Sequence, residues 1–226
     1  MDPNLPDEHL YTSQTHPYFR APHIYIALPT RYTAGMVGGV KKDAMLGSTD
    51  ILFMATRAGT AKFERLFTEA FIRPGLDPER WGNRANYAAC GVVPTGPAEI
   101  SIYHAHSGRR YVLRTDGFIS INAGAKAGEF ITNPFIFKGN GLFLNYSTAA
   151  NGFIRVEMLS ADGKPLKGFA LGDCQTMVGD SIAQAVAWIK CPGLKKYSGR
   201  PVRLRFVMKE ADLFSIQFRQ GNIAFT

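Results

Sequence analysis

The sequence predicts an all-β protein in which a partial β-propeller of about two blades is followed by a β-sandwich. Three observations lead to this class. Residues 141–218 contain short runs of alternating apolar residues closed by turns, a looser strand-and-turn repeat lies upstream, and the pattern of a long amphipathic helix is missing. We therefore expect propeller-like blades over residues 9–128 and the sandwich over residues 129–226.

The sandwich carries the clearest strand pattern. Residues 153–159 and 202–208 alternate in polarity, and successive side chains of a strand point to opposite faces of the sheet. A tight turn is expected over residues 161–164, where Asp162-Gly163 accommodates positive φ angles. The apolar positions expected to share one face are Ile154, Val156, Met158, Val202, Leu204, Phe206 and Met208.

The upstream part has weaker signals. Residues 1–22 hold four prolines among polar side chains, which is typical of extended coil. Residues 23–32 (HIYIALPTRY) predict one buried strand, because almost every position is apolar. The segments DILFMATRAG and EISIYHAHSG, at residues 50–59 and 99–108, share a polar start, a strand and a glycine turn, which suggests repeated blades.

The charge distribution bears on the class of partner. The net charge is +8, and residues 130–226 carry 12 basic against 6 acidic groups. In this half Arg203 and Arg205 alternate with apolar residues, which is typical of a solvated sheet face and not of the clustered cations of a nucleic-acid binder. We therefore do not expect nucleic acid as a partner.

Compartment signals indicate a reducing environment. The start of the chain lacks the apolar core of a signal peptide, and no apolar run reaches membrane-spanning length. We expect no membrane association, and a cytoplasmic location by default. Cys90, Cys174 and Cys191 are widely spaced without a C-x-x-C motif, which favours free thiols, although a Cys174–Cys191 bridge stays open. No cofactor is expected.

One pair of histidines could bind a metal. His104 and His106 are alternate residues, so they would share one face of a strand. The turn residues Ser107-Gly108 follow directly, and a solvated strand end explains the pair better. We assign no metal site and keep the two histidines only as candidate ligands.

The segment YFRAPHIYIALPTRY, residues 18–32, resembles the start of a blade in five-bladed β-propeller glycosidases of the invertase, inulinase, arabinanase and xylosidase group, which form glycoside hydrolase families 32 and 43. A blade of those enzymes commonly begins with Glu-x-Pro, and this Glu is the general acid. Nearly the full chain is also similar to a set of bacterial proteins with a propeller-plus-sandwich layout. The resemblance implies an oligosaccharide or polysaccharide as ligand.

The sequence departs from the enzyme pattern at the acid position. Arg20 stands there, in Arg20-Ala21-Pro22-His23, and arginine does not give up a proton at ordinary pH. A five-bladed propeller would also need roughly two or three more blades upstream, at about 40–50 residues each. We therefore expect a glycoside-hydrolase-like module that binds carbohydrate without a complete catalytic site, and we assign no catalytic residue.

Two alternatives stay open. The chain could be an active glycoside hydrolase of the fructan, arabinan or xylan type, with blades supplied by oligomerisation or by an upstream chain. It could also be a structural or assembly protein. Whether the chain is an enzyme is not decided by the sequence.

Sugar binding suggests its own residues, because aromatic faces stack on sugar rings while neighbouring polar groups bond the hydroxyls. Tyr87 and Trp81 border polar loops, although aromatic residues of a blade can equally form its core. The candidate sugar contacts are Arg20, His23, Trp81, Asn83, Arg84, Asn86 and Tyr87.

Self-association is expected through the blade-like half. Two blades cannot close a propeller, and residues 23–32 carry almost no charge with which to protect an unpaired strand edge. We therefore expect a homo-oligomer whose contact is centred on residues 18–60.

Overall fold

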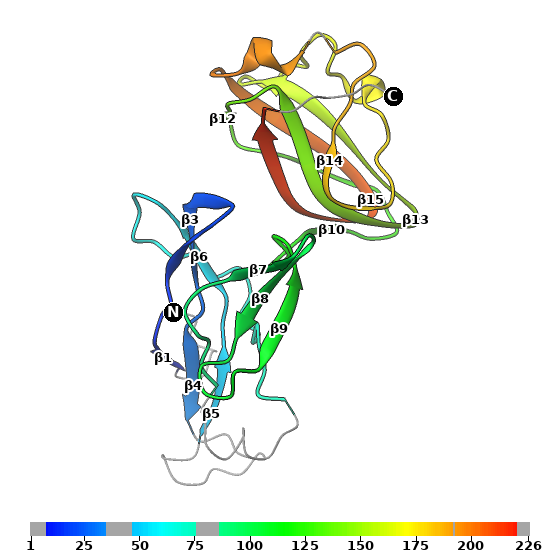
Figure 1. Cartoon of the computed structure of the whole chain (residues 1–226). Coiled ribbons are helices and arrows are strands. Elements are labelled where there is room, and N and C mark those ends of the chain that lie inside the picture. The colour runs from blue at the N-terminus through cyan, green and yellow to red at the C-terminus, as the bar shows by residue number, and fades with distance from the viewer. Residues whose placement is uncertain (1–7, 35–46, 76–85, 192, 221–226) are drawn as a thin grey trace. The chain divides into compact units, whose positions relative to one another are not determined.

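In the residues that the structure describes, regular structure consists of antiparallel strands and two short 3-10 helices, so the predicted all-β class is confirmed. The computed structural model describes residues 8–34, 47–75, 86–191 and 193–220, and Figure 1 shows the chain. Within these ranges no helix is both long enough and apolar enough to cross a bilayer. The chain divides into two compact units between Arg114 and Thr115.

The first unit contains three small sheets in the part of the chain that the structure describes, with strand orders β1-β4-β5, β2-β3-β6 and β7-β8-β9. The strands are β1 (Glu8–Tyr11), β2 (His16–Tyr18), β3 (Ala21–Ala27), β4 (Thr30–Ala34), β5 (Gly47–Ile51), β6 (Met54–Arg57), β7 (Val93–Gly96), β8 (Glu99–Tyr103) and β9 (Arg110–Arg114).

The first two sheets are the halves of one bent meander. Strands β3 and β4 are separated only by Leu28-Pro29, and strands β6 and β5 only by Leu52-Phe53. The two breaks face each other, because the Leu52 N–H donates to the Pro29 carbonyl at 2.9 Å. Proline has no N–H to donate, which explains why the ladder is interrupted at this point. The sheet therefore bends in its middle, around the fully buried Leu28 and the almost fully buried Leu52.

A fourth segment completes this meander. Residues 64–72, called here the edge segment, pair with the outer side of β5 and β6 through the bridges Ala55–Glu64 and Ile51–Ile72. The order across the sheet is then residues 8–18, residues 21–34, residues 47–57 and the edge segment. Four antiparallel segments are also the strand count of a propeller blade. We call this arrangement the blade-like sheet.

The expectation for residues 23–32 is wrong in one respect. The run is not a single strand with an open edge, because it is split between β3 and β4 and both of its sides are paired. Residues 8–18, which the sequence analysis treats as coil, supply the covering strands β1 and β2. The unpaired apolar edge that motivated self-association is therefore absent from this strand.

The second unit is dominated by two long paired strands. These are β13 (Gly141–Ser160) and β15 (Pro201–Arg219), and they form the order β10-β15-β13-β14 with further strands on β15 (Figure 1). The other elements are β10 (Ile121–Ala123), β11 (Gly128–Ile131), β12 (Phe135–Ile136), β14 (Asp180–Ala185), η1 (Leu171–Asp173) and η2 (Leu194–Tyr197).

Both long strands change direction at one corner. The register of β13 against β15 shifts between Thr148 and Phe153, and Glu210 of β15 has a φ of 43°. A side chain at Gly152 would overlap the backbone oxygen of Glu210, so only glycine permits this close approach. The corner lets the sheet fold over its own apolar face, as a sandwich requires.

The alternation predicted for this unit is confirmed. Every position expected to share the apolar face is buried, and Phe206 is completely so. The turn at 161–164 also forms, with Gly163 at a φ of 86°. The buried core comprises Phe137, Leu142, Leu144, Tyr146, Ile154, Val156, Met158, Phe169, Cys174, Met177, Val186, Trp188, Leu194, Val202, Leu204, Phe206, Met208, Ala211 and Leu213.

The structure bears on two sequence expectations about this unit: the boundary between the units is shifted, and the free thiols that the sequence favours are found. The units divide at 114/115 and not at 128/129, because β10 pairs with β15 and so draws residues 115–128 into the second unit. Cys174 and Cys191 are free, and each thiol is bonded locally: the Sγ of Cys174 accepts from the Val156 N–H, and that of Cys191 from the Gly193 N–H. Burial raises the pKa of both thiols.

We expect Phe206→Ala to lower the free energy of unfolding of the second unit by about 3–5 kcal/mol, because it empties a fully enclosed site. The Phe206 ring stacks on Phe130 with ring centroids 4.8 Å apart. Urea titration followed by tryptophan fluorescence measures the loss, since the buried Trp188 lies in the same core. Ile131→Ala, at a side chain 49% exposed, is the control and should cost less than about 1 kcal/mol. An unchanged urea midpoint for Phe206→Ala would contradict the assigned core.

Candidate functional site

The turn between β2 and β3 brings two of the predicted sugar contacts together. Arg20 lies in the turn and is half-buried, while His23, early in β3, is exposed. The backbone of His23 is fixed, because its carbonyl accepts a hydrogen bond from the Ala58 N–H at 2.9 Å. Arg20 and His23 therefore lie three residues apart, where the chain turns from β2 into β3.

Sequence reasoning missed the neighbouring aromatic residue. Phe19 occupies the same turn and is 46% exposed. Its ring packs edge-on against the buried Tyr18, with ring centroids 4.9 Å apart, so it is held in place while part of its surface stays open. The available signal was an aromatic residue directly before the Arg20-Ala21-Pro22 motif.

Asn86 has a different position from the one a sugar contact needs. It is 1% exposed, and its side-chain amide donates to the carbonyl of Thr49 at 3.0 Å and to Thr49 Oγ1 at 3.1 Å. The Thr30 hydroxyl donates to the Asn86 carbonyl at 3.0 Å. Asn86 thus joins the segment that leads to β7 to strands β4 and β5 of the blade-like sheet, inside the first unit.

The remaining candidates separate into two groups. Trp81, Asn83 and Arg84 lie outside the described residues. Tyr87 is half-buried, and its ring meets the His106 ring edge-on at 5.5 Å.

The two histidines belong to a local turn. The Nδ1 atom of the buried His104 is 3.1 Å from the Ser107 N–H, which donates to it, and His106 is exposed with its ring 6.1 Å from that of His104. In the described part of the chain, no three His, Cys, Asp or Glu side chains are grouped closely enough to hold a metal ion.

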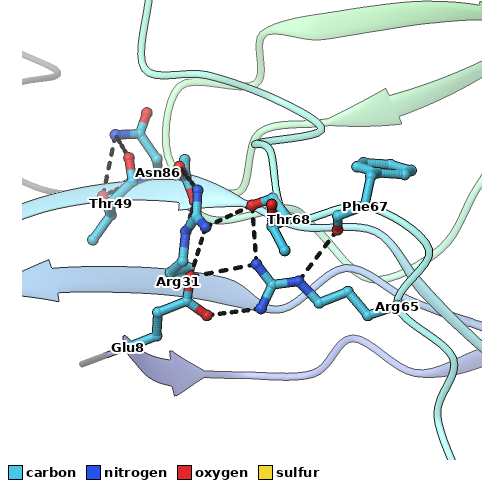
Figure 2. A network of polar contacts seen from close by, with 8 residues as sticks. Glu8, Arg31, Thr49, Arg65, Phe67, Thr68 and Asn86 are labelled. Atoms are coloured by element: carbon cyan, nitrogen blue, oxygen red, sulfur yellow. Dashed lines mark hydrogen bonds and ion pairs between the residues drawn. The ribbon is translucent and has the colours of Figure 1, made fainter. Parts of the chain in front are cut away.

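A network of ionised side chains crosses the blade-like sheet from one edge to the other (Figure 2). The Arg31 guanidinium binds both carboxylate oxygens of Asp50, at 2.9 and 2.6 Å, and also donates to Glu8 at 2.7 Å. Arg65 binds the other oxygen of Glu8 at 2.7 Å. Both arginines donate to the Thr68 carbonyl, at 2.8 and 3.0 Å. One network therefore joins β1, β4, β5 and the edge segment.

The register of the strands explains this geometry. Arg31 is paired directly with Asp50 across β4 and β5, and Glu8 pairs with Thr33, two residues along from Arg31 on the same face. The side chains of Glu8, Arg31, Asp50 and Arg65 are only 14–20% exposed. Charged hydrogen bonds with so little water nearby are stronger than surface pairs.

The network sets the protonation of its carboxylates. Hydrogen bonds from Arg65 and then Arg31 hold the pKa of Glu8 below its ordinary value, although burial opposes this shift. The hydrogen bond to Asp50 raises the pKa of Arg31. A general acid needs a raised pKa so that it carries a proton near neutral pH. Glu8 has the opposite shift, so it stays ionised.

Comparisons with known proteins add one similarity. No protein-family model matches the chain, and a search of curated proteins gives no match. Among solved structures, the chain is similar to a glycoside hydrolase family 43 arabinoxylan arabinofuranohydrolase from Bacillus subtilis, which was crystallised in complex with cellotetraose. The identity is 14% and the TM-score 0.26, with 93% of this chain and 54% of that chain covered. The chain therefore spans about half the length of that protein.

We expect Arg31→Met to lower the free energy of unfolding of the first unit by about 2–3 kcal/mol, because it leaves two poorly solvated carboxylates without their shared partner. The control is Lys62→Met, which breaks the exposed pair Lys62–Glu64 in the same sheet and should cost about 0–1 kcal/mol. Thermal and urea unfolding, followed by circular dichroism, compare the two variants. Equal losses of unfolding free energy in the two variants would show that the network stabilises the first unit no more than an exposed ion pair does.

Acid should weaken the first unit through Glu8. The folded state holds the pKa of Glu8 below its ordinary value of 4.5, so its stabilising contribution is complete above pH 4.5 and is lost as the pH falls through the lower, folded-state pKa. The urea concentration at the midpoint of unfolding, measured from pH 7 to pH 3, should decrease once the pH is below 4.5. In Glu8→Gln this midpoint should decrease less steeply over the same pH range. Parallel pH profiles for the two proteins would contradict the assignment.

Proposed function

We propose that this chain is a glycoside-hydrolase-like module that binds an oligosaccharide or polysaccharide and does not hydrolyse it. The observation that carries the proposal is that carboxylates of the blade-like sheet are held in ion pairs with cationic side chains. Glu8 and Asp50 are bound by arginines.

Hydrolysis of a glycosidic bond needs one protonated and one ionised carboxyl group on either side of that bond. Glu8 and Asp50 share one arginine, and the pKa of Glu8 is lowered and not raised. In the remaining sheet of the first unit, Glu99 is bonded to Arg110. The turn that resembles the acid-bearing motif presents Arg20, which supplies charge and hydrogen-bond donors but no transferable proton.

Binding is supported by the same turn. Phe19 offers a partly open aromatic face, and the donors of Arg20 and His23 are close to it in the chain. An aromatic face with flanking polar groups matches a sugar ring, which has apolar C–H faces and a rim of hydroxyls. We therefore assign Phe19, Arg20 and His23 as the sugar-contacting residues.

Affinity electrophoresis and calorimetry with arabinan, xylan and fructan test this function on the full chain. We expect retardation by at least one of them, with no reducing ends released after prolonged incubation. Phe19→Ala should weaken binding about tenfold. Stacking of a planar base on an aromatic side chain is worth roughly 1–3 kcal/mol, and we expect the loss of a sugar ring from the Phe19 face to lie in the lower part of this range. Val112→Ala, at a side chain 53% exposed on β9, is the control and should bind as the wild type does. Turnover by the unmodified chain, or no binding to any glycan, would overturn the proposal.

Self-association stays a prediction, although the open strand edges are not those of residues 23–32. The outer sides of β1 and β2 are the open edges of the blade-like sheet among the described strands, and Leu10 and Tyr11 of β1 are 50% and 48% exposed. Light scattering over a range of protein concentrations decides between a monomer and an oligomer. A monomer at all concentrations would remove the expectation and leave the carbohydrate proposal untouched.

A further inference from the structure

Four exposed cations lie at one end of the second unit. Lys195 and Lys196 are in the 3-10 helix η2, and Arg200 follows it by three residues. Lys138 comes from a distant part of the chain, and the hydrogen bonds of the preceding residue hold it there. The Phe137 carbonyl accepts from the Gly199 N–H at 2.9 Å and from the Ser198 hydroxyl at 3.5 Å. We call Lys138, Lys195, Lys196 and Arg200 the basic patch.

The cations of the basic patch are not neutralised. Within the described ranges, none of the four forms an ion pair with a carboxylate. Two other arginines of the unit differ sharply from them. Arg205 is bonded to Glu129 and Glu157, and Arg203 donates to the backbone carbonyl of Ala161. These basic residues of the second unit therefore fall into two groups. Arg203 and Arg205 form hydrogen bonds within the sheet, whereas the four residues of the basic patch form no ion pair with the described carboxylates.

Sequence and packing concentrate positive potential at the patch. Residues 181–209 contain no Asp or Glu, so the segment that supplies three of the four cations brings no acidic residue of its own. The Asp173 carboxylate is already occupied, since Lys190 lies 3.1 Å from it. Unpaired like charges held on one small surface create a field that attracts anions.

The surroundings of the patch are mostly polar, and the exposed large apolar side chain that the strand pairing places beside it is Ile136, paired with Pro201 and 65% exposed. The apolar residues of η2 face inward: Leu194 is 1% exposed, and the Tyr197 ring packs on Phe169 at 5.4 Å. Glycine and serine separate the cations along residues 198–200. Insertion into a bilayer needs several exposed apolar side chains beside the cations. Nucleic-acid binding generally uses a longer stripe, with about 6–10 phosphate contacts.

We propose that the basic patch binds an acidic polysaccharide, a chain whose sugar units carry carboxylate groups. That the ligand is an anion is inferred from the charge of the patch itself. That this anion is a saccharide rests on the proposed function. Lysine ammonium groups are compact charges with rotatable donors, so they can follow carboxylates spaced along a flexible polymer. The first unit would then hold the neutral part of a glycan, and the second unit would select glycans with acidic units.

A matched pair of variants tests the patch in the full chain. K195Q/K196Q removes two charges from the patch, and K126Q/K209Q removes two from the corner end of the same unit, so both lower the net charge of +8 by the same amount. Calorimetry in about 50 mM salt measures the dissociation constants for polygalacturonate and for neutral arabinan. We expect K195Q/K196Q to weaken polygalacturonate binding at least about tenfold and to reduce its salt dependence, because two counterion-releasing contacts are lost. K126Q/K209Q should stay within about twofold of the wild type.

The outcomes separate the two proposals. Equal losses in both variants would indicate a bulk charge effect and overturn the patch. Binding of single-stranded DNA, or of phosphatidylserine vesicles, that is tighter than polygalacturonate binding and depends on Lys195 and Lys196 would also overturn it. Loss of neutral arabinan binding in Phe19→Ala, with polygalacturonate binding retained, would support two independent sites. Absence of any neutral glycan binding, with a patch-dependent polygalacturonate interaction, would remove the proposed function of the first unit and keep the patch.

Discussion

The Arg31 guanidinium is the interaction on which the first unit depends. It lies on an inner strand of the blade-like sheet and binds Asp50 on one side and Glu8 on the other, while Arg65 and Thr68 tie in the edge segment. Local propensity alone would not hold these segments together, because each is short and the sheet is broken at Leu28-Pro29. A planar group with several fixed donors is suited to such a junction, and lysine could not make the same bonds.

The same junction limits the chemistry available to the sheet. Carboxylates that hold strands together must stay ionised, whereas a glycosidase must keep one carboxyl protonated. In this protein Glu8 and Asp50 are bound by arginines of the sheet, and Arg20 lies in the turn before β3. The proposed sugar binding uses the partly exposed ring of Phe19.

How far the sequence predicted the structure depended on the range of the interactions involved. Alternation at 202–208 and the Asp162-Gly163 turn are local patterns, and both were predicted correctly. The strands β1 and β2 were missed, because they are only four and three residues long, β2 contains a proline, and they form by pairing with β4 and β3. The Glu8–Arg31 contact joins residues that are far apart in the chain, so it could not be inferred before those strands were known. The exposure of Phe19 could not be predicted, because an aromatic residue beside an apolar run is equally typical of a buried core.

The ionisation of Glu8 connects the fold to the proposal of binding without hydrolysis, and it can be measured directly. Carbon-13 NMR of the side-chain carboxyl groups, with Glu8 assigned by comparison with Glu8→Gln, gives the midpoint of its titration in the folded protein. We expect a midpoint below the ordinary value of 4.5, set by the hydrogen bonds of Arg65 and Arg31. A midpoint above 4.5 would mean that Glu8 can hold a proton closer to neutral pH, and would contradict the conclusion that this network serves the fold and not acid catalysis.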